Sequence, residues 1–245
     1  MTPDRSRVGR EAANLVCGVV ILAAGASSRM GRPKLLLPWG ETSVLGHLIG
    51  QWQVLQARQI TVVHAEGDDA LDAELDRLAF VAVHRIANPT AERGMFSSIQ
   101  CAARWRGWNR ELTHWAIVLG DQPHLREQTL RALLECAAAH PQQVCQPARN
   151  GRARHPVIVP AAVFGRVADS SRANLKQFLQ NAAFDVALCP SDDAALDLDL
   201  DTPADYEKAL RIFLNSATAS AVESQCHKEF GQGARPSIRR NAAAR

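Results

Sequence analysis

The 245-residue chain lacks a strong charge imbalance, because its formal net charge is only +3. Much of this positive excess lies in the last residues, between Arg235 and Arg245, and not along the body of the chain. So small an excess does not indicate a nucleic-acid partner. Apolar runs of about eighteen residues, which a membrane-spanning helix needs, are also missing. We therefore expect a protein that binds neither nucleic acid nor a membrane.

Cysteine motifs are missing as well. The six cysteines, at positions 17, 101, 136, 145, 189 and 226, form no C-x-x-C pair and no zinc-ligand spacing. Scattered cysteines in a chain of this size are typical of cytosolic proteins with reduced thiols. Arginines at positions 5, 7 and 10 precede an apolar run, as in a secretion signal, but that run continues into a glycine-containing loop. We interpret the run as a strand and expect a cytoplasmic location.

Short apolar segments alternate with segments of helical spacing, which predicts an α/β fold with a mostly parallel sheet. One domain is expected over residues 15–215, preceded by a loose polar arm at 1–14. Residues 216–245 are rich in Ala, Ser, Gln, Gly and Arg, which predicts a disordered tail. Strands are expected at 15–24, 60–63, 80–83, 115–119, 144–147, 153–160 and 184–188. Helices are expected at 44–55, 68–78, 127–139 and 203–214, and a further helix follows Ser98 and ends at 105.

The most informative stretch runs from Val19 to Lys34, where an apolar strand breaks into a loop of small residues. Glycines 25 and 31 allow the backbone to turn tightly and to bring N–H groups close to phosphate oxygens. Arg29 and Lys34 add two positive charges. The spacing matches neither the P-loop nor the dinucleotide-binding motif. This pattern predicts a polyphosphate site, and the alternative is an ordinary strand-to-helix turn with incidental basic residues.

The loop also resembles a known signature. Its residues Leu22-Ala23-Ala24-Gly25-x-Ser27-x-Arg29-Met30-Gly31-x-x-Lys34 are similar to the loop of the nucleotidyltransferases, above all the molybdenum cofactor cytidylyltransferases. The resemblance implies a single three-layer, Rossmann-like domain with the nucleotide-diphospho-sugar transferase-like fold. It also implies that Arg29 and Lys34 contact phosphate and act in catalysis. The loop residues that it assigns to the nucleotide are Leu22, Ala23, Ala24, Gly25, Ala26, Ser27, Ser28, Arg29 and Lys34.

A second segment fits the same resemblance. Asn88-Pro89 and the following Gly94-Met95-x-Ser97-Ser98 are similar to a family segment that lines the base and ribose. The resemblance therefore assigns Asn88, Gly94, Met95, Ser97 and Ser98 to the nucleotide. A helix N-terminus also supplies free N–H donors. From the residues alone, a glycine turn before a serine-capped helix explains the segment equally well.

Two acidic motifs suggest a metal site. Gly120-Asp121-Gln122-Pro123 follows a predicted buried strand, where ligands of open α/β sheets bind. Residues 196–201 alternate leucine with aspartate, which places three aspartates on one face of an extended segment. An Asx turn and a solvated edge strand would produce the same two patterns. The resemblance implies that Asp121 and Asp199, with Asp201 as the fallback, hold Mg²⁺, and that Asp121 is catalytic.

The acceptor side departs from the family. Relatives usually carry Gly-His-Pro where this chain has Arg154-His155-Pro156, and residues 169–175 replace a glycine-rich loop. The resemblance assigns Gln122, Arg154 and His155 to the acceptor, although a lone histidine is more often structural. These departures leave the identity of the acceptor open.

The resemblance implies an enzyme that transfers CMP from CTP to the phosphate of a molybdopterin-type acceptor and releases pyrophosphate. A molybdenum hydroxylase is the implied client protein. The Ala23-Ala24-Gly25 form favours CTP, since guanylyl relatives typically show Leu-Ala-Gly-Gly. The alternatives are a guanylyl- or sugar-phosphate nucleotidyltransferase of the same fold and a non-catalytic cofactor carrier or insertion chaperone. Retention of Lys34, Asp121 and Asp199 argues against the carrier.

Overall fold

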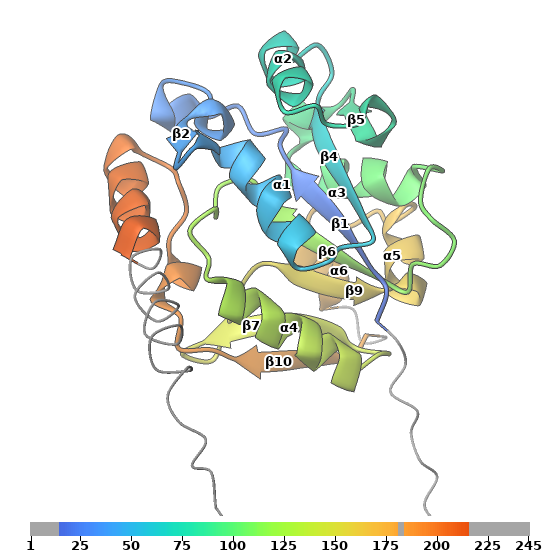
Figure 1. The fold of residues 1–245 in the computed structure, drawn as a ribbon. Helices are drawn as coiled ribbons and strands as arrows, with labels where there is room; N and C mark the ends of the chain where they lie inside the picture. The colour runs from blue at the N-terminus through green and yellow to red at the C-terminus, as the bar shows by residue number, and fades with distance from the viewer. Residues whose placement is uncertain (1–14, 181–183, 216–245) are drawn as a thin grey trace, which may run out of the picture.

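The computed structural model describes residues 15–180 and 184–215, which form a central sheet covered by helices on both faces (Figure 1). The predicted arm at 1–14 and tail at 216–245 lie outside these residues. Seven strands follow the order β10-β7-β9-β6-β1-β4-β5, and β8 pairs with β7. Their bounds are β1 Cys17–Leu22, β4 Gln59–Ala65, β5 Arg85–Asn88, β6 His114–Leu119, β7 Val144–Arg149, β8 Arg152–Ala153, β9 Val157–Pro160 and β10 Val186–Pro190. Strands β2 (Pro38–Trp39) and β3 (Thr42–Ser43) form a separate antiparallel pair.

Strand β1 lies in the middle of the sheet, parallel to β4 on one side and to β6 on the other. All six of its residues are buried, because helices cover both faces of a parallel sheet. Val19 and Ile21 pack into one hydrophobic cluster, while Val20 and Leu22 pack into a second. Strand β9 runs antiparallel to both β6 and β7, so the sheet is mostly parallel, as the alternation of elements predicts.

The helices divide between the two clusters. Helices α1 (Val44–Val54), α2 (Asp69–Arg77) and α4 (Glu127–Ala139) contribute to the cluster of Val19, and residues 203–215, which are also helical, pack against it. Helices α3 (Met95–Arg104), α5 (Ala161–Val167) and α6 (Leu175–Leu179) contribute to the cluster of Val20. The predicted three-layer α/β architecture is therefore confirmed (Figure 1). No helix in the described part of the chain is long and apolar enough to cross a bilayer.

The strand predicted at 80–83 is wrong. Val81 and Val83 are 55% and 64% exposed, and Ala82–His84 forms a short 3-10 turn. The strand at this edge is β5, which pairs with β4 through Arg85–Asn88. Because β5 lies at the edge and only Ile86 and Asn88 are buried, it carries no continuous apolar run. A search for apolar runs therefore selects the preceding valines.

The strands expected at 144–147 and 153–160 are joined by a hairpin turn at Asn150-Gly151, which connects β7 to β8. Both turn residues have positive φ values, 51° and 73°, as a tight hairpin turn requires. The strand predicted at 153–160 is interrupted after Ala153, however, and β9 pairs mainly with β6. Arg154 and His155 therefore lie between β8 and β9, and the Arg154 N–H donates to the Pro147 carbonyl of β7 at 2.8 Å.

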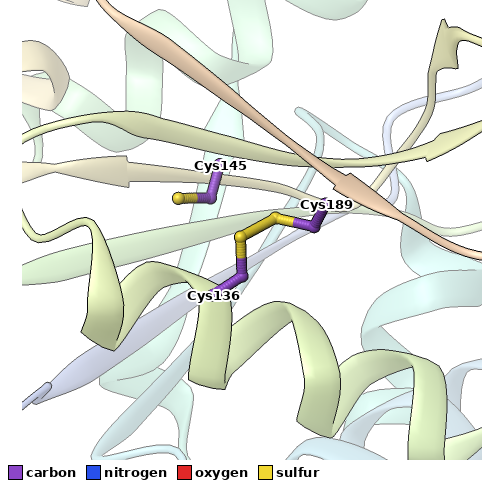
Figure 2. A group of neighbouring side chains, drawn as sticks. All are labelled: Cys136, Cys145 and Cys189. Atoms are coloured by element: carbon purple, nitrogen blue, oxygen red, sulfur yellow. A yellow bond between two sulfur atoms is a disulfide. The ribbon is translucent and has the colours of Figure 1, made fainter.

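The expectation of reduced thiols is wrong for one pair. Cys136 in α4 and Cys189 in β10 form a disulfide with a Cα–Cα separation of 6.4 Å. Figure 2 shows the third cysteine, Cys145, beside this pair. The two bonded residues are 53 positions apart, so their sequence spacing contains no signal for the bond.

Candidate nucleotide-binding site

The loop after β1 is anchored at its start by two neighbouring strands. The Ala23 N–H donates to the Val63 carbonyl at 2.8 Å, and the Gly120 N–H donates to the Leu22 carbonyl at 3.1 Å. A Cβ at Gly120 would lie 2.7 Å from that same carbonyl oxygen, so only glycine fits. The carboxyl ends of β1, β4 and β6 therefore meet at one edge of the sheet, where α/β proteins bind ligands.

The loop then turns around the short 3-10 segment Ser28–Met30. Ser27 and Gly31 flank it with positive φ values of 48° and 70°, and the Lys34 N–H donates to Ser27 Oγ at 3.2 Å. A Cβ at Gly25 would meet no protein atom within 4 Å. Gly25 is exposed, so its lack of a side chain leaves room for a ligand beside the backbone.

Lys34 connects this loop to the end of β6. Its Nζ donates to Asp121 Oδ2 at 2.7 Å, and the two side chains are only 16% and 20% exposed. Lys34 Nζ also lies 3.9 Å from Asp201 Oδ1. Arg29 pairs with the same Asp201 oxygen at 2.9 Å. Two loop cations and two aspartates from distant parts of the chain therefore form one network.

Asp199 and Asp201 point toward this network because buried and exposed residues alternate in their segment. Leu198 and Leu200 are buried in the core, so Asp199 and Asp201 project from the opposite side of the backbone. The Leu200 N–H donates to the Asp121 carbonyl at 3.0 Å, which fixes the segment beside the Asp121 loop. Gln122 Nε2 donates to Asp199 Oδ1 at 2.9 Å.

The electrostatics of the two acids suit a divalent cation. Loss of water contact and the charge of Asp121 raise the pKa of Asp199, the hydrogen bond from Gln122 opposes this, and Asp201 adds to the rise. Asp121 Oδ1 is buried and has no hydrogen-bond partner within residues 15–180 and 184–215. Mg²⁺ is commonly bound by one or two carboxylates together with substrate phosphates, and Asp121 with Asp199 supplies such a pair. Within the same residues, no three aspartates lie close enough together to hold a metal ion by themselves.

Hydrogen bonds connect several of the residues that are predicted to line the nucleotide base. Asn88, which is buried at the end of β5, donates through Nδ2 to Ser97 Oγ and Ser98 Oγ, both at 2.9 Å. Ser97 Oγ in turn donates to the Gly94 carbonyl at 2.8 Å. Gly94 has a φ of 91°, which favours glycine, and Met95 is 41% exposed. Asn88, Ser97 and Ser98 thus shape the loop through internal hydrogen bonds, while Gly94 and Met95 lie at its surface-facing turn.

The three predicted acceptor residues lie in different settings. Gln122 is buried and bonded to Asp199. Burial lowers the pKa of His155, while the Ile117 carbonyl and the charge of Asp121 act in the opposite direction. Arg154 pairs with Asp197, with Nε and Nη2 at 2.8 and 2.5 Å from Oδ1. His155 therefore lies within the field of Asp121, whereas Arg154 belongs to a separate ion pair.

Sequence reasoning missed Arg149, which also pairs with Asp197. It lies at the end of β7, directly before the turn at Asn150-Gly151, and no motif distinguishes it. Asp197 belongs to the leucine–aspartate alternation, so its outward position could be predicted, but its two arginine partners could not. Two arginines therefore share the carboxylate of Asp197, which precedes the candidate metal ligand Asp199 by two residues.

The sequence profile described as "MobA-like NTP transferase domain" matches residues 19–186. Molybdenum cofactor cytidylyltransferase of Escherichia coli (strain K12) is 25% identical over 189 residues, which cover 76% of this chain and 92% of that protein. A probable molybdenum cofactor guanylyltransferase of Bacillus mycoides is 24% identical over 66% of this chain and 74% of that protein.

Two further similarities are relevant. Bifunctional protein GlmU of Jannaschia sp. is 30% identical over half of this chain, but the match spans only 26% of that relative. In three dimensions, Rv0371c of Mycobacterium tuberculosis H37Rv in complex with manganese matches with a TM-score of 0.60. That match covers 80% of this chain and 98% of the other at 23% identity, which establishes the shared fold.

Proposed function

The chain belongs to the family of MobA-like NTP transferase domains, and from that premise we propose that it transfers CMP from CTP to the phosphate of a molybdopterin-type acceptor. The observation that carries the proposal is the network in which Lys34 contacts Asp121 at 2.7 Å and Arg29 contacts Asp201 at 2.9 Å. It places two cations of a small-residue loop against acids from two other segments. Such an arrangement suits a triphosphate.

The proposed reaction needs positioning and charge compensation more than covalent help from the protein. A phosphate oxygen of the acceptor attacks the α-phosphorus of the nucleotide, and pyrophosphate leaves. Arg29 and the loop N–H groups hold the β- and γ-phosphates that become pyrophosphate. Lys34 stabilises the charge that develops around the α-phosphate. A phosphate nucleophile is already ionised near neutral pH, so the proposal requires no general base.

Mg²⁺, held by Asp121 and Asp199, would supply charge neutralisation at the phosphate oxygens when bound. Lys34 Nζ donates to Asp121 Oδ2, while Asp121 Oδ1 has no hydrogen-bond partner among the residues that the structure describes. Asp121 can therefore contact a cation through one oxygen and retain Lys34 on the other. Asp201 positions Arg29 and Lys34, so it supports the loop cations even when Asp199 is the ligand.

The proposed acceptor site rests on the positive charges of Arg149 and Arg154. A molybdopterin-type acceptor carries a phosphate, and Arg154 and Arg149 share a single carboxylate at Asp197. Two guanidinium groups that share one carboxylate retain donors for an anionic ligand. We propose that Arg154, Gln122 and His155 contact the acceptor, and that a molybdenum hydroxylase receives the product.

The choice of CTP rests on the first loop. We place the base against the loop at Ala23 and Ala24. The Ala23 side chain is 2% exposed and packs in the core, whereas Ala24 is partly exposed, so Ala24 is the alanine whose side chain can face the base. Asn88, Ser97 and Ser98 support the segment that we place on the other side of the base. The Escherichia coli relative, whose name assigns it a cytidylyl reaction, supports this choice.

Two alternatives have support of their own. The Bacillus mycoides relative carries a guanylyltransferase name, so GTP is the main competing nucleotide. The GlmU matches support a sugar-phosphate acceptor, although they span only part of those relatives. A cofactor carrier without turnover is the third alternative.

The test is product identification with CTP labelled on the α-phosphate, incubated with the chain, Mg²⁺ and molybdopterin. The proposal expects the label in an acceptor conjugate and unlabelled pyrophosphate in equal amount. Label in free CMP would indicate hydrolysis, and turnover only with a sugar 1-phosphate would support the second alternative. Absence of turnover with every nucleotide and acceptor would favour the carrier.

A further inference from the structure

Three cysteines from different elements meet between the sheet and α4. Cys136 lies in α4, Cys145 in β7 and Cys189 in β10 (Figure 2). Their sulfur atoms all lie within 4.8 Å of one another, although Cys145 is not part of the disulfide. Among the residues that the structure describes, no other group of three or more potential ligands of this kind is so close. The nucleotide site uses none of these residues.

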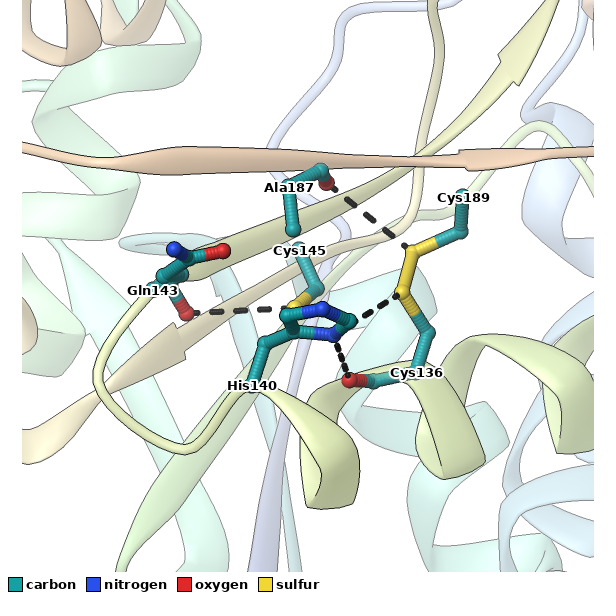
Figure 3. The surroundings of a disulfide bond; sticks show 6 residues. All are labelled: Cys136, His140, Gln143, Cys145, Ala187 and Cys189. Atoms are coloured by element: carbon teal, nitrogen blue, oxygen red, sulfur yellow. Dashed lines mark hydrogen bonds between the residues drawn. A yellow bond between two sulfur atoms is a disulfide. The ribbon is translucent and has the colours of Figure 1, made fainter.

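His140, at the end of α4, is the candidate fourth donor, and it would have to move to join the three sulfur atoms that lie within 4.8 Å of one another. His140 follows the helix directly, and its Nδ1 lies 4.0 Å from Cys136 Sγ and 2.9 Å from the Cys136 carbonyl oxygen (Figure 3). The residue is exposed, so its ring can rotate without displacing core side chains. If the Nδ1–H remains bonded to the carbonyl, Nε2 is free to act as a ligand, which is the usual arrangement for metal-bound histidines.

We propose that the reduced chain binds one Zn²⁺ through Cys136, Cys145, Cys189 and His140. Tetrahedral Zn²⁺ with three thiolates and one imidazole is a common closed structural site, with Zn–S distances of about 2.3 Å. Soft thiolate ligands also select against Mg²⁺, which prefers oxygen. The disulfide and the metal site exclude each other, because Cys136 and Cys189 cannot be both bonded to one another and present as thiolates. A two-electron reductant such as a phosphine or a dithiol cleaves the S–S bond to give two thiols, and each thiol releases its proton when its sulfur binds Zn²⁺.

The position of the cluster gives the site a structural role. Helix α4 follows the Asp121 loop, and β10 leads into the segment that carries Asp199. A metal bound between them joins the two parts of the chain that deliver the candidate metal ligands of the nucleotide site. The disulfide joins only α4 and β10, whereas the proposed metal also includes β7 through Cys145.

The experiment uses the full-length chain, reduced and kept without oxygen, and titrated with Co²⁺ as a spectroscopic probe for Zn²⁺. We expect one Co²⁺ per chain, with thiolate-to-metal charge transfer and the intense visible bands of a tetrahedral site. Zn²⁺ should displace the Co²⁺. Oxygen ligands such as Asp121 produce no thiolate charge transfer, so the signal separates this site from the nucleotide site.

Cys145→Ser is the decisive variant, because it leaves the Cys136–Cys189 pair able to form its disulfide. It should lower Co²⁺ affinity at least tenfold and weaken the charge-transfer band, whereas the control Cys101→Ser should bind Co²⁺ like the wild type. His140→Ala, at an exposed position, should fold normally, lower the affinity and alter the visible bands. Absence of thiolate charge transfer in the reduced wild type, or wild-type affinity in both Cys145→Ser and His140→Ala, would overturn the proposal. The readout involves no nucleotide, so it is independent of the proposed activity.

Discussion

Asp121→Asn isolates the charge of the acid at the centre of the proposed site. The substitution keeps the shape of the side chain and still offers an oxygen to Lys34 Nζ, which lies 2.7 Å from Oδ2. It removes the negative charge that would bind a cation through the partnerless Oδ1. It also removes a charge that raises the pKa of Asp199. The fold and the reaction should therefore respond differently.

Two opposing effects act on the free energy of unfolding. Loss of a charge-assisted hydrogen bond to Lys34 destabilises by about 1.5–3 kcal/mol at most, and the amide oxygen retains part of it. Relief of repulsion between Asp121 and Asp199 acts in the other direction. We expect a net change in unfolding free energy within about 1.5 kcal/mol, which shifts Tm by about 3–6 °C at this chain length. Catalysis has no such compensation, and loss of one well-placed electrostatic contact lowers the rate about 100- to 1,000-fold.

The assay is pyrophosphate release with CTP, acceptor and limiting Mg²⁺, accompanied by thermal unfolding of the same samples. Asp192→Asn is the matched control, because Asp192 is fully exposed and pairs only with Arg126 in the described structure. The control should keep wild-type turnover. Near-wild-type activity of Asp121→Asn at limiting Mg²⁺ would show that Asp121 is not a ligand. A collapse of Tm would assign it a structural role instead.

Three further predictions follow from the same contacts. Asp199→Asn should abolish most turnover and raise Tm at neutral pH. A raised pKa means that the ionised acid destabilises the folded state above that pKa, so the Tm difference should shrink as the pH falls towards about 4, and a constant difference would contradict this. Arg154→Ala should raise the KM for the acceptor at least about tenfold, since a charged hydrogen bond contributes about 1.5–3 kcal/mol, and leave the KM for CTP unchanged. Ala24→Gly should reduce the ratio of kcat/KM for CTP to that for GTP. An unchanged ratio would show that Ala24 does not determine the choice of nucleotide.

Much of the fold could be predicted because buried parallel strands carry continuous apolar runs. Strand β1 is such a case, with every residue buried between two layers of helices. Strand β5 could not be predicted in the same way, since an edge strand needs apolar residues only on the side that packs, and Ile86 alone supplies a large one. The four residues of β9 contain no pattern that indicates its antiparallel direction.

The site shows the same division. Local patterns indicated Lys34, Asp121 and the aspartates at 199 and 201 as separate motifs, and the fold brings them together across 87 positions in the case of Lys34 and Asp121. Patterns did not indicate the pairing of Asp197 with Arg149 and Arg154, nor the meeting of Cys136 with Cys189. These contacts depend on which strands become neighbours, and no spacing along the chain encodes that order.

Nucleotide choice in the presence of a molybdopterin acceptor tests the central claim most directly. Pyrophosphate release measured with CTP and with GTP should give a kcat/KM at least about tenfold higher for CTP, a difference of about 1.4 kcal/mol in transition-state binding. The proposed physical basis is the contact of the base with the loop at Ala24, together with backbone groups matched to cytosine, since each unmatched buried polar group costs about 1–3 kcal/mol. Equal kcat/KM values for the two nucleotides, or a preference for GTP, would contradict the cytidylyl assignment.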